Sequence, residues 1–284
     1  MIRKLIALAA VLALTGGMAA AGAEGGQAAG EMTLLSVNVG KADAHLLCCG
    51  DDAYLIDTGT KESADRLFSV LRDNGITRLS GVILTHTHDD HTGSLNALLQ
   101  SDIRVEKVYA PAFYNGKEKK HPAVKALKKY GREGQELIWL SAGDTLPFGD
   151  GTLCVLGPLE HNEEKENNNS LVLLASGGSG TLLLTGDMEF PEEESLLGAG
   201  VIPHVDVIKI GNHGEDDATS TELIRAASPS VAVISTNTAD EPDTPSPRVI
   251  RLLEIWNVKV LQTQDAKDGV LVIFRDGEIL TELK

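Results

Sequence analysis

The residues best suited to chemistry in this sequence are three histidines and two aspartates within the six positions His86-Thr87-His88-Asp89-Asp90-His91. They follow an apolar run at residues 81–85 that is typical of a buried strand, and they precede a helix expected at residues 94–100. A buried group of histidines without partners would be costly, whereas neutral imidazole and carboxylate are good ligands for zinc-like ions. The motif therefore predicts a metal centre where a buried strand ends.

Short apolar runs separated by turns predict the elements that must position this motif. In the first half of the chain we expect strands at 32–39, 44–49, 53–56, 81–85 and 105–110, with helices at 63–74 and 94–100. In the second half we expect strands at 152–156, 171–175, 181–185, 205–210, 231–235 and 259–262, helices at 220–227 and 247–256, and a hairpin across Arg275-Asp276-Gly277. Two mixed sheets packed face to face, with helices outside, would satisfy these patterns in an α/β fold.

The N-terminus has the composition of an export signal. A basic start at residues 1–4 is followed by an apolar run at 5–14 and by small residues at 19–23. We expect a signal peptide at 1–23, a flexible Gly/Ala-rich tether at 24–30 and a single domain at 31–284. The apolar run is short for a membrane span, and an uncleaved anchor is the alternative. The prediction is a secreted or extracytoplasmic protein without a stable membrane span after signal removal.

The charge balance narrows the classes of partner. Lys and Arg number 25 and Asp and Glu 41, which gives a formal net charge of −16. This argues against broad coating of nucleic acid, which needs a wide positive field. One positive island interrupts the pattern at residues 117–132, where Lys125, Lys128, Lys129 and Arg132 fall on one predicted helical face opposite Val124 and Leu127. This island is either a solvated helix or a ridge that binds the phosphates of a small or polymeric anionic substrate.

The histidine motif matches the HxHxDH signature of the metallo-β-lactamase superfamily. Further segments resemble the ComEC/Rec2-like branch of that superfamily, in the same order and spacing from about Met32 to the C-terminus. They are Val37-Asn38-Val39-Gly40-Lys41-Ala42-Asp43-Ala44, Leu55-Ile56-Asp57-Thr58-Gly59, Asn167-Asn168-Asn169-Ser170-Leu171-Val172-Leu173, Leu183-Leu184-Thr185-Gly186-Asp187 and Ile208-Lys209-Ile210-Gly211-Asn212-His213-Gly214. The sequence thus resembles a soluble, secreted hydrolase domain, and the resemblance implies a four-layer αββα sandwich.

The resemblance also implies a set of site residues. His86 and His88 would bind a first ion, and Asp187 would bridge it to a second. The remaining ligands of the second ion would be Asp90, His91 and His213, of which Asp90 is the residue on which catalysis should depend. Outside the ligands, Asp57 would orient a ligand histidine by accepting its other N–H, Asp43 would support the loop geometry, and Asn167 would lie in the outer shell.

The implied cofactor is a pair of divalent ions that hold a bridging hydroxide, which attacks a phosphorus or a carbonyl carbon. Many superfamily members place a histidine where this chain has Asn167-Asn168-Asn169, although the ComEC/Rec2-like branch shares the asparagine. The usual His-His-Gly is Asn212-His213-Gly214, and no histidine precedes Pro245. The first site is therefore poorer in ligands and is expected to be partly occupied, with Zn²⁺ as the expected metal and Mn²⁺ as the alternative.

Three functions remain open at this point. The leading one is an exported, metal-dependent hydrolase of phosphomonoesters or phosphodiesters, such as DNA, nucleotides or a cell-envelope phosphodiester. A second keeps the metals but hydrolyses a carbonyl group in a lactone, thioester or β-lactam, and the asparagine at the third ligand position weighs against a β-lactam. A third is a catalytically weakened metal-binding module, suggested by the missing histidines.

Overall fold

Alternating apolar side chains place the central strands between two hydrophobic layers. In β1 (Met32–Val37), Met32 and Leu34 pack on one side of the sheet while Leu35 and Val37 pack on the other. This follows because successive side chains of a strand point to opposite faces. A strand of this kind must be covered on both faces, so the pattern requires more than one layer on each sheet.

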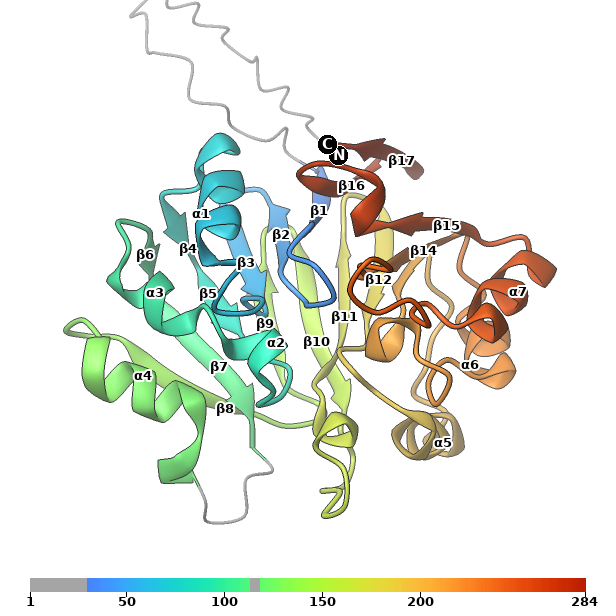
Figure 1. The fold of residues 1–284 in the computed structure, drawn as a ribbon, viewed down its shortest axis with the longest axis horizontal. Helices are drawn as coiled ribbons and strands as arrows, with labels where there is room; N and C mark the ends of the chain where they lie inside the picture. The colour runs from blue at the N-terminus through green and yellow to red at the C-terminus, as the bar shows by residue number, and fades with distance from the viewer. Residues whose placement is uncertain (1–29, 113–117) are drawn as a thin grey trace, which may run out of the picture.

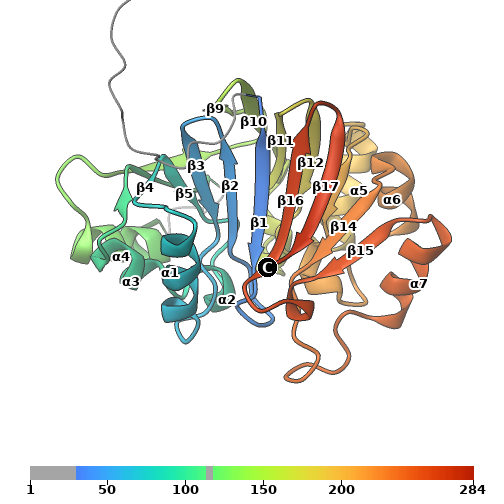
Figure 2. The same cartoon turned by 90° about the horizontal axis from the view of Figure 1, so that it is seen from above.

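The computed structural model describes residues 30–112 and 118–284 and contains two large mixed sheets stacked face to face, as Figures 1 and 2 show. The first sheet has the order β17-β16-β1-β2-β3-β5-β7-β8. Its further strands are β2 (His45–Cys49), β3 (Asp52–Ile56), β5 (Gly81–Ile83), β7 (Lys107–Pro111), β8 (Glu136–Leu140), β16 (Gly269–Arg275) and β17 (Glu278–Leu283). A small parallel pair, β4 (Arg78–Leu79) and β6 (Arg104–Val105), lies outside it.

The second sheet has the order β15-β14-β13-β12-β11-β10-β9. Its strands are β9 (Thr145–Phe148), β10 (Gly151–Gly157), β11 (Val172–Gly177), β12 (Gly180–Leu184), β13 (Val207–Lys209), β14 (Val231–Ile234) and β15 (Lys259–Gln262). Leu182 and Leu184 of β12 point into the core shared with the first sheet, and Leu183 points to the helices outside. The space between the two sheets is therefore one continuous apolar core.

Helices cover the outer face of each sheet (Figures 1 and 2). The first sheet is covered by α1 (Ala64–Asp73), α2 (Asp89–Thr92), α3 (Leu95–Gln100) and α4 (Pro122–Tyr130). The second is covered by α5 (Phe190–Ala199), α6 (Thr221–Ala227) and α7 (Pro247–Ile255). Short 3-10 helices occur at η1 (Glu118–Lys120), η2 (Glu166–Asn169), η3 (Gly211–Gly214) and η4 (Thr263–Asp265). The predicted four-layer αββα sandwich is confirmed.

Most predicted elements are present within one to three residues of their expected ends, and the hairpin at Asp276 and Gly277 is formed by two residues of positive φ. Strands β8 and β9 were not predicted. Arg132 was wrongly placed on the helical face, because α4 ends at Tyr130 and the Arg132 guanidinium instead donates to the Ser101 carbonyl. Lys117, in the same basic island, lies outside the described residues.

The predicted signal peptide at 1–23 and all but the last residue of the tether at 24–30 also lie outside the described residues. Within the part of the chain that the structure describes, no helix is both long and apolar enough to cross a bilayer. The division into signal, tether and domain stays a prediction.

Candidate metal centre

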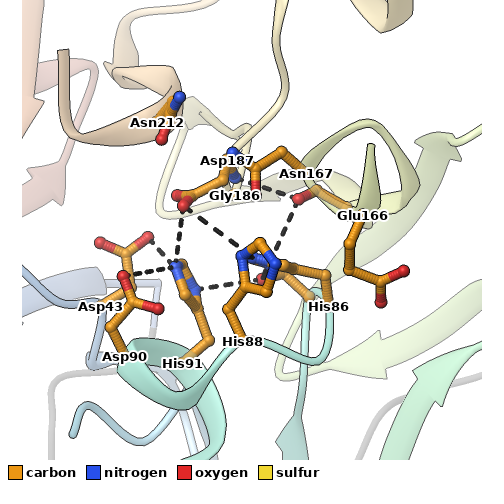
Figure 3. A network of polar contacts seen from close by, with 12 residues as sticks. Asp43, His86, His88, Asp90, His91, Glu166, Asn167, Gly186, Asp187 and Asn212 are labelled. Carbon is orange, nitrogen blue, oxygen red and sulfur yellow. Dashed lines mark hydrogen bonds and ion pairs between the residues drawn. The ribbon is translucent and has the colours of Figure 1, made fainter. Parts of the chain in front are cut away.

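Strand direction brings the polar residues of the motifs to one edge of the sandwich. Strands β3 and β5 run parallel to each other, and so do β12 and β13, so the loops at their carboxyl ends emerge together. Asp57 follows β3, the histidine motif follows β5, Asp187 follows β12 and His213 follows β13. Figure 3 shows the labelled side chains of this group, among them His86, His91 and Asp187, converging from separate loops on one small volume.

Four of the predicted ligands form a tight cluster, which we call the His91–His213 side. The ligand atoms of Asp90, His91, Asp187 and His213 all lie within 4.8 Å of one another. The Oδ2 atom of Asp187 is 3.1 Å from His91 Nε2 and 3.4 Å from His213 Nε2, and Asp90 Oδ2 is 3.3 Å from His213 Nε2. Neither buried Nε2 atom makes a hydrogen bond to the described residues. Two orphaned imidazole nitrogens facing two carboxylates fit a divalent ion.

The fold fixes the orientation of both rings through their other nitrogens. His91 Nδ1 donates to Asp57 Oδ2 over 2.7 Å, and Asp57 itself accepts hydrogen bonds from the amide and hydroxyl of Thr85. His213 Nδ1 donates to the carbonyl of Ser235 over 3.0 Å. Since a carboxylate and a carbonyl only accept, each Nδ1 carries the hydrogen and each Nε2 is left to face the centre. The predicted orienting contact of Asp57 is thus present.

The charges of this side reinforce each other. Burial opposes protonation of His213, but the carboxylates of Asp187 and Asp90 outweigh it and raise its pKa to about 9. Burial also opposes protonation of His91, yet Asp187 and Asp57 raise its pKa well above the usual range. The same imidazoles hold the pKa of Asp187 well below its usual range despite its burial. Without an ion this side binds protons, which a divalent ion would displace.

The other predicted ligands, His86 and His88, are held less firmly, and we call them the His86–His88 side. His86 Nε2 is 3.1 Å from His88 Nδ1 and 3.9 Å from Asp187 Oδ2. The Nδ1 of His86 contacts two hydroxyls, those of Thr85 and Ser170, at 3.1 and 3.3 Å. Burial and the neighbouring His91 hold the pKa of His86 well below its usual range, so it is neutral and able to ligate. His88 is exposed.

Comparison with known proteins places this arrangement in a family. Residues 37–238 match the family model of the metallo-beta-lactamase superfamily. The chain belongs to the metallo-beta-lactamase superfamily. Members of this superfamily are generally metal-dependent hydrolases that bind divalent ions, often two, as the sequence predicted. The Asp and His groups described above are the candidate ligands for such ions in this chain.

The relatives also bear out the predicted branch. The chain is 31% identical over 199 residues to ComE operon protein 3 of Bacillus subtilis, covering 69% of this chain and 25% of that protein. It is 30% identical over 233 residues to the competence protein ComA of Neisseria gonorrhoeae, covering 81% of this chain and 29% of that protein. The chain therefore spans less than a third of the length of either relative.

Among solved structures, the fold is similar to that of the metallo-beta-lactamase fold protein YhfI from Bacillus subtilis, with a TM-score of 0.58 and 14% identity. The match covers 86% of this chain and 99% of that one. At this identity the similarity concerns the fold alone. It agrees with the two sheets and outer helices described above.

A buried lysine completes the metallo-beta-lactamase site of this chain and was given no role by sequence reasoning. Lys209, on β13, is 1% exposed; its Nζ contacts the Asp43 carboxylate, donates to the Gly186 carbonyl over 2.9 Å and lies 3.7 Å from Asp187 Oδ1. Burial opposes its charge, but Asp43 and Asp187 outweigh it and raise its pKa. Lys209 thus links Asp43, expected to support the loop, to the shared Asp187. In the sequence it stands as a charge in an apolar run, within a segment that resembles the ComEC/Rec2-like branch.

The remaining predicted residues are not members of the tight four-residue cluster. Asn167 is in η2 and donates through Nδ2 to Glu189 Oε1 over 3.0 Å. Lys125, Lys128 and Lys129 are exposed on α4, and no polar contact of the centre among the described residues includes them. Their role in substrate binding stays a prediction, as do the individual ligand roles.

Proposed function

We propose that this chain is an exported hydrolase of phosphodiesters or phosphomonoesters, with DNA, a nucleotide or a cell-envelope phosphodiester as its substrate. The observation that carries the proposal is the charge of the centre. The centre contains the carboxylates of Asp43, Asp57, Asp90 and Asp187 and the ammonium of Lys209, which contacts Asp43 and lies near Asp187. Two divalent ions (+4) offset the net charge of these five groups, −4 + 1 = −3, together with the −1 of a hydroxide, so the loaded centre no longer repels an anionic substrate.

The relatives support the same class of substrate. One of them is named competence protein ComA and another ComE operon protein 3, which favours a nucleic acid or nucleotide over a neutral ester. The overall charge of −16 restricts this to a focused contact at the centre and not a broad coating of nucleic acid. The lysines of α4 are the proposed contacts for a polymeric anion outside the centre, whether DNA or an envelope polymer.

The residues of this chain have distinct tasks in the proposed reaction. A pair of divalent ions, Zn²⁺ or in its place Mn²⁺, would supply a nucleophilic hydroxide near neutral pH and stabilise negative charge on the phosphoryl oxygens. Asp57 and the Ser235 carbonyl hold the Nε2 atoms of His91 and His213 toward the centre. Asp90 has a side chain 32% exposed, so it is the carboxylate ligand that meets both solvent and substrate.

Metal analysis and a substrate panel test the proposal. The purified protein should contain more than one divalent ion per chain and should hydrolyse bis-p-nitrophenyl phosphate or single-stranded DNA. Turnover of nitrocefin or a thioester alone would favour the carbonyl alternative and contradict the proposal. An absence of turnover together with less than one ion per chain would favour a weakened metal-binding module and would contradict it equally.

Export is the second part of the proposal. A basic start, an apolar run and small residues precede residue 24, and we propose cleavage after residue 23 and release outside the cytoplasm. Mass spectrometry of the protein from fractionated cells measures the first residue directly. An N-terminus near residue 24 in the extracytoplasmic fraction supports the proposal, and an intact chain in the membrane fraction supports the uncleaved anchor instead.

A further inference from the structure

The amide of Asn167 is held in one orientation. Its Nδ2 donates to Glu189 Oε1, while its Oδ1 is buried and has no hydrogen-bond partner among the described residues. Glu189 Oε2 accepts from the Asn168 amide over 3.1 Å and lies 2.8 Å from Lys165 Nζ. Both carboxylate oxygens of Glu189 are therefore used as acceptors. Since a carboxylate only accepts, the NH₂ group of Asn167 must face it and the carbonyl oxygen must face away.

The same contacts tie η2 to the loop that carries Asp187. Glu189 lies two positions after Asp187 and is the N-cap residue of α5. Asn168 Oδ1 in turn accepts hydrogen bonds from the backbone amides of Glu189 and Glu192, both at 3.3 Å. Asn167 and Asp187 are thus joined through one buried network, and the free Oδ1 cannot turn away without breaking it.

Asn167 lies on the side of the centre that has fewer candidate ligands. Figure 3 shows Asn167 on the side of His86, across the cluster from Asp43 and Asp90. The His91–His213 side already has four protein ligands, whereas His86 and His88 have only Asp187, which they share. A buried acceptor without a partner is costly. A divalent ion next to His86 and His88 would remove that cost.

We propose that the Asn167 carbonyl oxygen is the third ligand of the His86–His88 side, and that Glu189 positions it by binding its amide nitrogen. The inference rests on the metal centre of the proposed function but not on its substrate. The resulting set is two imidazoles, a neutral amide oxygen and one shared carboxylate. Because it has no carboxylate of its own, this side binds every divalent ion more weakly than the other, and its amide oxygen favours a harder ion such as Mn²⁺.

Titration of the ion-free full chain with MnCl₂, with free Mn²⁺ measured by electron paramagnetic resonance, tests the assignment. The wild type should show a tighter and a weaker class of site. Asn167→Leu should weaken the weaker class at least about 10-fold and leave the tighter class within about twofold. Asn167→Asp keeps an oxygen donor and adds charge, so it should bind the second Mn²⁺ more tightly than the wild type. Asn167→His should shift the weaker class toward Zn²⁺ in competition with Mn²⁺.

Neighbouring residues provide the controls. Asn169 belongs to the same run but bonds to the backbone of Asn162, so Asn169→Ala should leave both classes unchanged even if it lowers the melting temperature. Glu189→Gln should weaken the weaker class several-fold, because one acceptor for the Asn amides becomes a donor. If Asn167→Leu does not fold, Asn167→Asp and Asn167→His still test whether Asn167 is a ligand.

Unchanged binding of both classes in Asn167→Leu, or in the Asp and His variants together, would overturn the inference. The outcome is independent of the substrate. If the Asn167 variants bind Mn²⁺ as expected but the protein hydrolyses no phosphoester, the proposed function is contradicted and the assignment of Asn167 as a ligand is supported. If the protein hydrolyses phosphoesters but the Asn167 variants bind Mn²⁺ like the wild type, the proposed function is supported and the assignment of Asn167 as a ligand is contradicted.

Discussion

The two sides of the metal centre differ in how firmly the fold holds their histidines. His91 and His213 each donate Nδ1 to an oxygen that can only accept, so their ring positions and tautomers are fixed. His86 contacts only hydroxyls at its Nδ1, which can donate or accept, and His88 is exposed beside it. The first arrangement is organised before an ion arrives, whereas the second becomes organised only when one binds.

The number of carboxylates also favours ion binding on the His91–His213 side. The His91–His213 side has Asp90 in addition to the shared Asp187, while the His86–His88 side has no carboxylate of its own among the residues described. Firm orientation and extra charge act together on affinity. In the proposed two-ion centre, the missing histidine should therefore weaken one half and leave the other half intact, so occupancy should be graded and not lost.

The largest expected effect comes from removing Asp90, the carboxylate that belongs to the His91–His213 side only. Asp90→Ala should weaken the tighter ion more than about 100-fold, since loss of an outer-shell partner alone costs about 10–100-fold. Phosphoester kcat/KM should fall by at least about 1,000-fold, because no strongly held ion then remains. The matched variant His88→Ala should affect only the weaker ion. Calorimetric metal titration and steady-state kinetics distinguish the two. Equal losses of ion affinity and of kcat/KM in both variants would contradict the prediction that the two sides bind ions with different affinity.

The next comparison removes an orienting contact from each side. Asp57 has a φ of 60°, which asparagine tolerates, so Asp57→Asn keeps the backbone and replaces the oxygen that accepts from His91 Nδ1 and the Thr85 hydroxyl. It should weaken the tighter ion about 10–100-fold. Ser170→Ala removes a hydroxyl beside His86 and should weaken the other ion only a few-fold. Metal titration of both variants measures the difference, and a larger effect of Ser170→Ala would reverse our ranking of the two sides.

The two sides should also respond differently to pH. The folded pKa of His213 is raised to about 9 from an ordinary 6.5, so its protonation stabilises the ion-free protein below pH 6.5 and this stability is lost as the pH rises toward 9. Ion affinity changes in the opposite sense, by about 10-fold per pH unit for each displaced proton. The pKa of His86 is lowered, so protonation of His86 should not compete with an ion at the weaker site in this window.

Melting temperatures of the ion-free protein and metal titrations at pH 6.5, 7.5 and 8.5 check this expectation. The melting temperature should fall with pH while the affinity of the tighter site rises. The variant His213→Gln keeps a polar side chain without the titration, so both trends should become weaker, and the remainder should come from His91, whose pKa is also raised. A tighter site whose affinity does not change with pH would show that no proton is displaced from this side.

The parts of the centre that are local in sequence are the parts that sequence could predict. The motif from His86 to His91 occupies one loop, and its place after a buried strand was readable from the apolar run before it. The resemblance supplied Asp57 and Asp187. The pairing of Asn167 with Glu189 joins residues 22 positions apart through one hydrogen bond. No residue pattern marks such a contact.

The burial of the Lys209 charge was equally impossible to predict from the sequence. Lys209 lies in a strand whose neighbours are apolar, and only the tertiary fold places Asp43 and Asp187 against its ammonium. Among the secondary elements, β9 contains Pro147, which removes a strand hydrogen bond and suppresses the usual signal. It lies at the edge of its sheet, where a proline is tolerated.

The smallest expected effect lies outside both sides of the centre. A triple Lys125/Lys128/Lys129→Gln variant should raise KM for single-stranded DNA by a few-fold and reduce its salt slope by about 0.7 for each lost phosphate contact. It should not change kcat for bis-p-nitrophenyl phosphate, which is too small to reach from the centre to α4. Arg225 and Arg251 are exposed on the opposite helical layer, and an Arg225/Arg251→Gln double variant provides the control for lost positive charge. Equal salt slopes in the triple variant and the wild type would show that α4 is a solvated helix without a role in substrate binding. The centre alone would then account for the choice of an anionic substrate.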